Sequence, residues 1–180
     1  MPILYVFENS GNCEKIITIL RILNIPYEKV VLDRDKIPDD FVLKSPLKKV
    51  PVFEDNRTVY LESMSILFYL AQGTHLMPKN QVNLLKWFSF EQSEIQQTIG
   101  VARYKIKFQF QQEDVLQARG YRALQIIEEH LKHFPFFEGT FSICDIAMAA
   151  YIRLAEDAYM DLKGFPEIIN WLKRIDYEIK

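Results

Sequence analysis

The sequence predicts a small α/β domain followed by an all-helical domain. Strand and helix patterns alternate over residues 1–73, whereas every periodic stretch after residue 81 has helical spacing. Between them lies a polar segment containing Pro78, where a domain boundary is expected. We therefore expect an α/β domain over 1–73, a linker over 74–81 and an all-helical domain over 82–180.

The first half opens with a βαβ pattern. The apolar run over residues 3–7 predicts a strand, and the polar cluster over 8–12 predicts a turn. From Cys13 the apolar residues recur at helical spacing until the helix stops before Pro26, and residues 27–32 alternate like a strand. Such a crossover places its two strands parallel.

The rest of the first half adds a helix, a hairpin and another helix. Residues 37–44 predict a short helix, and the runs 50–53 and 58–61 flank a polar turn. Ser63 is expected to cap a helix over 64–70. The complete order is βαβαββα.

Four helical segments are expected in the second half. The first two span about 82–110 and 113–134. A third follows Ser142 and runs to about Tyr159, and the last begins after Pro166.

Composition narrows the possible functions. The 180 residues are 49% hydrophobic and 26% charged, which suits a globular core. A formal net charge of −2 argues against a nucleic-acid-binding protein, which needs a basic face. No signal-peptide pattern appears, and no run approaches the roughly 18 apolar residues of a membrane span. We expect a cytoplasmic protein with no membrane segment.

The potential metal ligands are scattered along the chain. Cys13 and Cys144 match no metal or redox spacing, and His75, His130 and His133 form no HxxxH or HExxH motif. No metal is therefore expected.

Three short segments of the first half carry candidate chemistry. Ser10 and Asn12 lie in a turn that follows a strand and opens a helix, where unpaired N–H groups bind anions; helix capping is the commoner role. Val50-Pro51 begins a strand, and a cis bond there would present the Val50 backbone to a ligand, although a trans bond is commoner. Glu62-Ser63 precedes a helix and suits either a cap beside a solvated acid or a site for a ligand with both an ammonium and a carboxylate group.

Together these segments resemble the cytosolic glutathione transferases along essentially the whole chain. The matching stretches are Leu4-Tyr5, Ser10-Gly11-Asn12-Cys13, Ser45-Pro46, Lys49-Val50-Pro51-Val52, Leu61-Glu62-Ser63, Ile66-Leu67, Tyr69-Leu70-Ala71, Leu76-Met77-Pro78 and Ser142-Ile143-Cys144-Asp145-Ile146-Ala147. The resemblance implies a thioredoxin-like first domain that binds glutathione and an all-α helical bundle that helps to bind a small electrophile. This is the glutathione S-transferase fold.

The resemblance also implies a bacterial-type member with a serine-type active site. Ser10 matches the serine that serves the thiol, and Asn12 matches an asparagine near the same sulfur in some bacterial members. Val50 is implied to bind the cysteinyl part through its backbone, with Pro51 in the cis form. Cys13 is expected to face inward as a small apolar residue.

The two ends of glutathione are assigned to other residues. Glu62 and Ser63 are implied to hold the γ-glutamyl end. Lys48 or Lys49 is a candidate partner of the glycyl carboxylate, with a solvated loop lysine as the alternative.

The helical half carries weaker expectations. Arg103, Tyr104 and Phe108 are candidates for the electrophile site, although aromatic residues at helical spacing are more often core. Ser142 and Asp145 resemble a structural capping box. A homodimer is implied, to which Trp87, Phe88 and Phe90 are candidate contributors.

The implied function is transfer of the glutathione thiolate to an electrophile, with a role in detoxification. Two other classes remain open. One is a glutathione-dependent peroxidase, isomerase or disulfide reductase. The other is a non-catalytic binding or regulatory protein.

Overall fold

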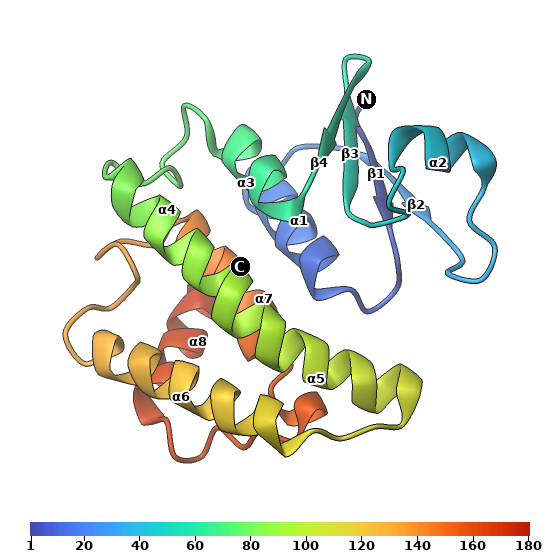
Figure 1. Cartoon of the computed structure of the whole chain (residues 1–180). Coiled ribbons are helices and arrows are strands. Elements are labelled where there is room, and N and C mark those ends of the chain that lie inside the picture. Colours follow the sequence, from blue (N-terminus) through green and yellow to red (C-terminus); the bar gives the residue numbers. More distant parts are fainter. The chain divides into compact units, whose positions relative to one another are not determined.

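The computed structural model describes all 180 residues and divides into two compact units. Unit 1 spans Met1–Thr74 and unit 2 spans His75–Lys180. Figure 1 shows a sheet with flanking helices in unit 1 and helices alone in unit 2. No helix is both long and apolar enough to cross a membrane.

Unit 1 contains a four-stranded mixed sheet with the strand order β2-β1-β3-β4 (Figure 1). Its elements are β1 (Ile3–Val6), α1 (Gly11–Ile22), β2 (Glu28–Val31), α2 (Asp39–Lys44), β3 (Val52–Asp55), β4 (Thr58–Leu61) and α3 (Ser63–Ala71). β1 and β2 pair in parallel, whereas β3 is antiparallel to β1 and to β4. The predicted order and strand directions are confirmed.

The core of unit 1 lies between the sheet and the helices α1 and α3, which pack against each other (Figure 1). Alternate residues of β1 point inward, so Leu4 and Val6 are buried. The helical spacing of α1 places Ile16 and Leu20 on its buried side, and α3 contributes Ile66. The alternation in β1 and the helical spacing in α1 therefore place their apolar residues in this core.

The expected cap of α3 is wrong by one residue. The N-cap is Glu62, whose backbone lies in the left-handed region at φ 64°, and Ser63 is the first residue of the helix. The amide N–H of Ile66 accordingly donates to the Glu62 carbonyl. Because Glu62 occupies the N-cap position, the Ser63 hydroxyl does not cap α3. It contacts Asn12 of α1 instead.

Unit 2 is entirely helical. Its elements are α4 (Gln81–Phe90), η1 (Glu91–Gly100), α5 (Val101–Tyr104), η2 (Lys105–Gln109), α6 (Asp114–Leu131), α7 (Ile143–Ile152), η3 (Glu156–Ala158) and α8 (Pro166–Glu178). The first four form one continuous helical rod, with π-type hydrogen bonding in η1 and η2, which confirms the long segment expected over about 82–110. Phe110 ends the rod in the left-handed region at φ 54°.

The helix expected from Ser142 to about Tyr159 is shorter than predicted. α7 ends at Ile152, and the chain turns into the short 3₁₀ helix η3. Ala155 and Ala158 are both fully buried. These two alanines are three residues apart, which is the repeat of a 3₁₀ helix. The sequence therefore keeps an apolar pattern close to helical spacing beyond the end of the α-helix.

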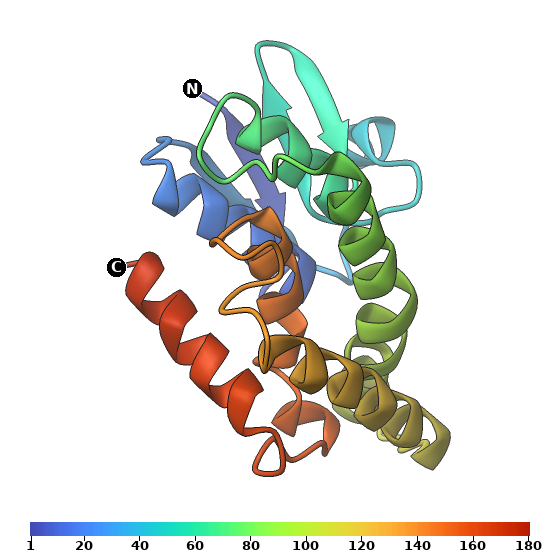
Figure 2. The same cartoon turned by 90° about the vertical axis from the view of Figure 1, so that its left-hand side faces the viewer.

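α7 is the central helix of unit 2 (Figure 2), and all of its residues are buried. The capping box at its start is present: the Ser142 Oγ accepts from Cys144 N at 3.2 Å, and Asp145 Oδ2 accepts from Ser142 N at 3.0 Å. Asp145 Oδ1 also accepts from the backbone N–H of Phe137 and from the indole of Trp171. One carboxylate thus joins α7 to the preceding loop and to α8.

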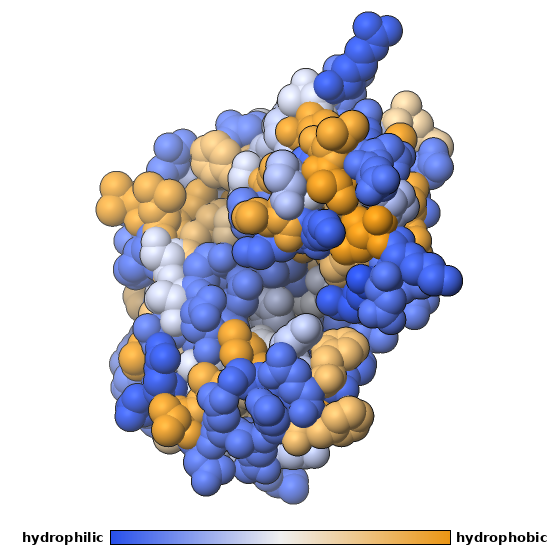
Figure 3. Space-filling model, turned by 45° about the vertical axis from the view of Figure 1, so that its right-hand side comes forward, coloured by the Kyte–Doolittle hydropathy of each residue, from blue (hydrophilic) through white to orange (hydrophobic).

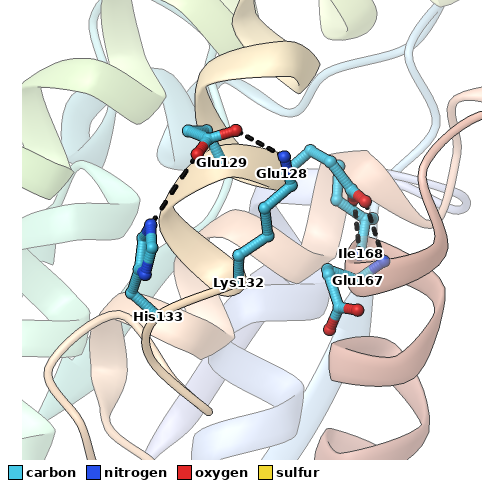
Figure 4. A network of polar contacts seen from close by, with 6 residues as sticks. All are labelled: Glu128, Glu129, Lys132, His133, Glu167 and Ile168. Carbon is cyan, nitrogen blue, oxygen red and sulfur yellow. Dashed lines mark hydrogen bonds and ion pairs between the residues drawn. The ribbon is translucent and has the colours of Figure 1, made fainter.

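A second carboxylate joins α6 to α8. Glu128 is buried, and its two oxygens accept from the backbone N–H groups of Glu167 and Ile168 at 3.0 and 2.9 Å (Figure 4). α8 has no side-chain cap of its own, so this glutamate satisfies the first-turn donors instead.

Candidate functional site

The topology of unit 1 brings the three candidate segments to one edge of the sheet. Tyr5, Val52 and Leu61 lie in one row across β1, β3 and β4. Because β3 is antiparallel to both neighbours, β1 and β4 end at the edge where β3 begins. The segments that meet this edge are residues 7–12, 50–51 and 62–63.

Ser10 caps the first helix. Its backbone is extended, and its Oγ accepts from the N–H of Cys13 at 3.4 Å. The capping role considered from the sequence is therefore real. It does not exclude a ligand role, because accepting this bond leaves the hydroxyl hydrogen available to donate.

Asn12 links the starts of α1 and α3. Its Oδ1 accepts from the Ser63 hydroxyl at 3.3 Å and from the Lys15 Nζ at 2.9 Å. Ser63 therefore uses its hydroxyl on Asn12, while the first-turn N–H groups of α3 receive no side-chain cap from Glu62. An uncapped helix start of this kind is suited to a carboxylate.

Lys15 is a residue that the sequence reasoning missed. It is fully buried on the inner side of α1. The available signal was its position three residues after Asn12 and four before Ile19, at the spacing of the buried face. A lysine at an apolar position of a helix needs a polar partner, because burying an unpaired ammonium group is costly.

Cys13 is buried and faces inward, as expected. Burial raises the pKa of its thiol, an effect that the Ser10 hydrogen bond only partly offsets. A raised pKa disfavours the nucleophilic thiolate, and the buried side chain of Cys13 belongs to the core of unit 1.

The peptide bond between Val50 and Pro51 is cis, as the family resemblance implies. Pro51 is buried and Val50 is half-buried. The sheet pairing of β3 begins only at Val52, so the Val50 backbone lies outside the ladder. The loop before it is shaped by Ser45, whose hydroxyl donates to the Lys49 carbonyl and accepts from the Lys49 N–H.

Three charged side chains at this edge are exposed. Glu62 presents its carboxylate to solvent beside the start of α3, and Lys48 and Lys49 are exposed in the loop before Pro51. The edge therefore offers one negative group, two positive groups and two helix N-termini.

The electrophile-site candidates lie together on the rod of unit 2 but differ in their surroundings. Arg103 is buried, and its Nε donates to Asp157 Oδ2 at 2.8 Å, so this guanidinium already has an ion-pair partner. Tyr104 and Phe108 are exposed, with ring centroids 5.2 Å apart. The two aromatic residues are thus not core residues.

The aromatic residues proposed for a dimer contact are mainly internal. Trp87 and Phe88 are buried, and Trp87 packs edge-on against Phe137 and His130. These side chains serve the core of unit 2, and only Phe90 is partly exposed. No group of three or more His, Cys, Asp or Glu side chains is arranged to hold a metal ion.

Comparisons with known proteins agree with this architecture. Residues 4–75 match the family model described as glutathione S-transferase, N-terminal domain, and residues 101–174 match the model described as glutathione S-transferase, C-terminal domain. A glutathione S-transferase domain-containing protein of Dictyostelium discoideum is 28% identical over 95% of this chain and 76% of its own length.

Two solved structures are similar over almost the whole chain. A possible glutathione S-transferase from Rhodopseudomonas palustris is 34% identical, with a TM-score of 0.91, covering 98% of this chain and 94% of that one. A glutathione S-transferase from Pseudomonas fluorescens is also 34% identical, with a TM-score of 0.89, covering 96% and 93% of the two chains. The chain belongs to the glutathione S-transferase family.

Proposed function

We propose that this protein is a serine-type glutathione transferase that binds glutathione at the edge of the unit 1 sheet and activates its thiol. The observation that carries the proposal is the position of Ser10. Its hydroxyl sits at the start of α1, at the same sheet edge as the Val50 backbone and the start of α3. Family membership supplies the ligand class.

The charges at this edge complement those of glutathione, which carries two carboxylates and one ammonium group. The uncapped start of α3 at Ser63 suits the γ-glutamyl carboxylate, and exposed Glu62 suits the neighbouring ammonium group. Lys48 or Lys49 suits the glycyl carboxylate. The Val50 N–H and C=O, which lie outside the sheet ladder, suit the backbone of the cysteinyl part.

The energy needed to activate the thiol is modest. A free thiol has a pKa of about 8.5, so only a few per cent is thiolate at neutral pH. Lowering that pKa by about two units requires about 2.7 kcal/mol. A hydroxyl donor to a charged sulfur supplies about 1.5–3 kcal/mol, and a helix N-terminus about 0.3–1 kcal/mol. Ser10 and the start of α1 therefore suffice.

The reaction that follows is nucleophilic displacement or addition. The thiol proton passes to solvent, and the thiolate sulfur forms a bond to an electrophilic carbon. With an aryl halide, the carbon–halogen bond breaks and the halide leaves with the bonding electrons. Tyr104 and Phe108 offer the exposed apolar surface on unit 2 that is expected for the electrophile, and a role in detoxification follows from this chemistry.

A homodimer belongs to the same proposal. Val59 and Leu61 of β4 and Phe68 of α3 are exposed apolar residues of unit 1. Figure 3 shows hydrophobic side chains gathered among hydrophilic ones on the upper half of the molecular face that it presents. Light scattering at micromolar protein is expected to give twice the 21.3 kDa chain mass, and a value near 21.3 kDa would contradict the dimer.

The activity is tested by a product screen. Purified protein is supplied with glutathione and, separately, with an aryl halide, an organic peroxide and a mixed disulfide, and the products are identified. Formation of the glutathione–aryl thioether above the uncatalysed rate supports the proposal. Turnover of only the peroxide or the disulfide would assign a different glutathione chemistry, and binding without turnover of any substrate would indicate a binding protein.

A further inference from the structure

The side chain of Lys15 is fully buried in the structure. Removing an ammonium group from water costs several kcal/mol unless polar groups surround it. A fold that keeps a lysine on the inner face of α1 must therefore supply such groups. One of them is Asn12, whose Oδ1 lies 2.9 Å from Lys15 Nζ.

This contact decides which way the Asn12 amide is turned. A lysine ammonium has three donors and no acceptor, whereas an asparagine amide has one acceptor oxygen and one donor nitrogen. The oxygen must therefore face Lys15. The Ser63 hydroxyl donates to the same oxygen at 3.3 Å, which selects the same orientation.

The orientation has a consequence for the site. Because Oδ1 is held by two donors, Nδ2 lies on the opposite side of the planar amide and remains available to donate. Asn12 is only half-buried and lies two residues after Ser10, in the first turn of α1. Its amide and the Ser10 hydroxyl are thus two side-chain donors at one helix start.

We propose that Lys15 is a positioning residue for the thiol chemistry, because it holds the Asn12 amide with its NH₂ group turned toward the glutathione sulfur. Lys15 itself does not touch the substrate. The inference rests on the proposed glutathione-binding function and deepens it. Without Lys15 the amide can rotate and present its oxygen to the thiolate, which is repulsive.

The first test replaces Lys15 with an apolar residue of similar length. Lys15→Met is expected to raise the pKa of bound glutathione by about half to one unit, which lowers the thiolate fraction about two- to fivefold at pH 6.5. The loss in kcat/KM is expected to disappear at pH 9, where the thiol ionises unaided. Lys15→Arg keeps a donor and is expected to restore the pH profile.

A double-variant comparison shows whether Lys15 acts through Asn12. In an Asn12→Ala background, Lys15→Met is expected to cause no further shift in the thiol pKa. Additive shifts would mean that Lys15 acts directly by its charge, and this would overturn the positioning role. An unchanged pKa in Lys15→Met alone would also overturn it.

A second variant keeps the inference testable if Lys15→Met does not fold. Asn12→Asp is nearly isosteric and retains an oxygen for Lys15, but it presents a second, negatively charged oxygen in place of the NH₂ group. The thiol pKa is expected to rise above that of Asn12→Ala. An Asn12→Asp value equal to or below the Asn12→Ala value would contradict the proposed orientation.

Failure of this inference is distinguishable from failure of the proposed function. If the wild-type protein does not bind glutathione or does not lower its thiol pKa, the proposed function is wrong. If the wild-type protein binds glutathione and lowers its thiol pKa, the proposed function stands. An unchanged thiol pKa in Lys15→Met, or shifts that add to those of Asn12→Ala, would then show that only the role of Lys15 is wrong.

Discussion

The indole Nε1 of Trp171 donates a 2.9 Å hydrogen bond to Oδ1 of Asp145, and both side chains are fully buried. The contact joins α8 to the capping box of α7. The carboxylate that completes this capping box therefore also contacts a helix that begins more than twenty residues later.

Trp171→Phe is expected to destabilise the protein by about 1–3 kcal/mol, because it removes a donor to a buried carboxylate and leaves a small void. Chemical denaturation monitored by circular dichroism measures the change. Trp87→Phe is the matched control, since the buried Trp87 Nε1 has no hydrogen-bond partner. Equal losses in the two variants would show that the Asp145 contact adds nothing beyond packing.

Asp145 is expected to make stability depend on pH between about 4 and 6. Burial raises the pKa of this carboxyl to about 6, although hydrogen bonds from Trp171, Phe137 and Ser142 oppose the rise. A folded-state pKa above the unfolded value near 3.9 favours the folded state at low pH, and this contribution is lost as pH rises through 6.

Asp145→Asn tests this dependence. The stability difference between wild type and variant is expected to be larger at pH 4 than at pH 7, by about 2–3 kcal/mol. Urea denaturation at both pH values measures it. A constant difference across this range would contradict the raised pKa.

His130 is expected to act in the opposite direction. Its ring lies parallel to those of Phe134 and Phe137, and burial lowers the pKa of the imidazole. Protonation therefore opposes folding, so this contribution is present above about pH 6.5 and is lost as pH falls. His130→Phe is expected to lose less stability than wild type between pH 7 and pH 5 in thermal unfolding. A steeper loss in the variant would contradict this.

Glu128→Gln is expected to destabilise the protein by about 1–2 kcal/mol. One of the two carboxylate oxygens that accept from the start of α8 is replaced by a donor, which faces another donor. Glu129→Gln is the control, since Glu129 is an exposed neighbour paired with Lys132 (Figure 4). Its expected effect on stability is much smaller, because solvent screens an exposed ion pair. Equal losses of stability in Glu128→Gln and Glu129→Gln would show that the Glu128 carboxylate does not stabilise the start of α8.

Ser10→Ala is expected to lower kcat/KM for conjugation about 10- to 100-fold at pH 6.5, corresponding to about 1.5–3 kcal/mol of lost thiolate stabilisation. The variant also loses a helix cap. Asn80→Ala controls for that loss, because Asn80 caps α4 through Val82 and Asn83 and lies in unit 2. Full activity in Ser10→Ala would contradict this role of Ser10 and make Asn12 the candidate for stabilising the thiolate.

The sequence was sufficient for the order of the elements because each has a local pattern. The alternation in β1, the helical spacing of α1 and the hairpin turn before β4 depend on neighbouring residues alone. Where the outcome depended on backbone angles, the predictions were less accurate. The N-cap of α3 is Glu62 and not Ser63, and the backbone of Glu62 has a positive φ. A glutamate rarely adopts this conformation, so its residue type does not predict it.

Side-chain contacts were predictable only in part. Ser142 and Asp145 follow a short local motif, and their bonds are those expected. The bond from Lys15 to Asn12 is also local, but the full burial of Lys15 depends on tertiary packing that its own segment does not specify. The Glu128 cap of α8 joins residues about forty positions apart, and no sequence pattern reveals it.

The most direct test of the central claim is an ultraviolet difference titration of glutathione bound to the wild-type protein between pH 5 and 9. Thiolate absorbs near 240 nm, so the signal reports binding and ionisation together. The proposed site predicts a saturable thiolate signal with a midpoint about two units below the pKa of the free thiol. A midpoint equal to that of free glutathione, or no saturable signal at millimolar glutathione, would contradict it.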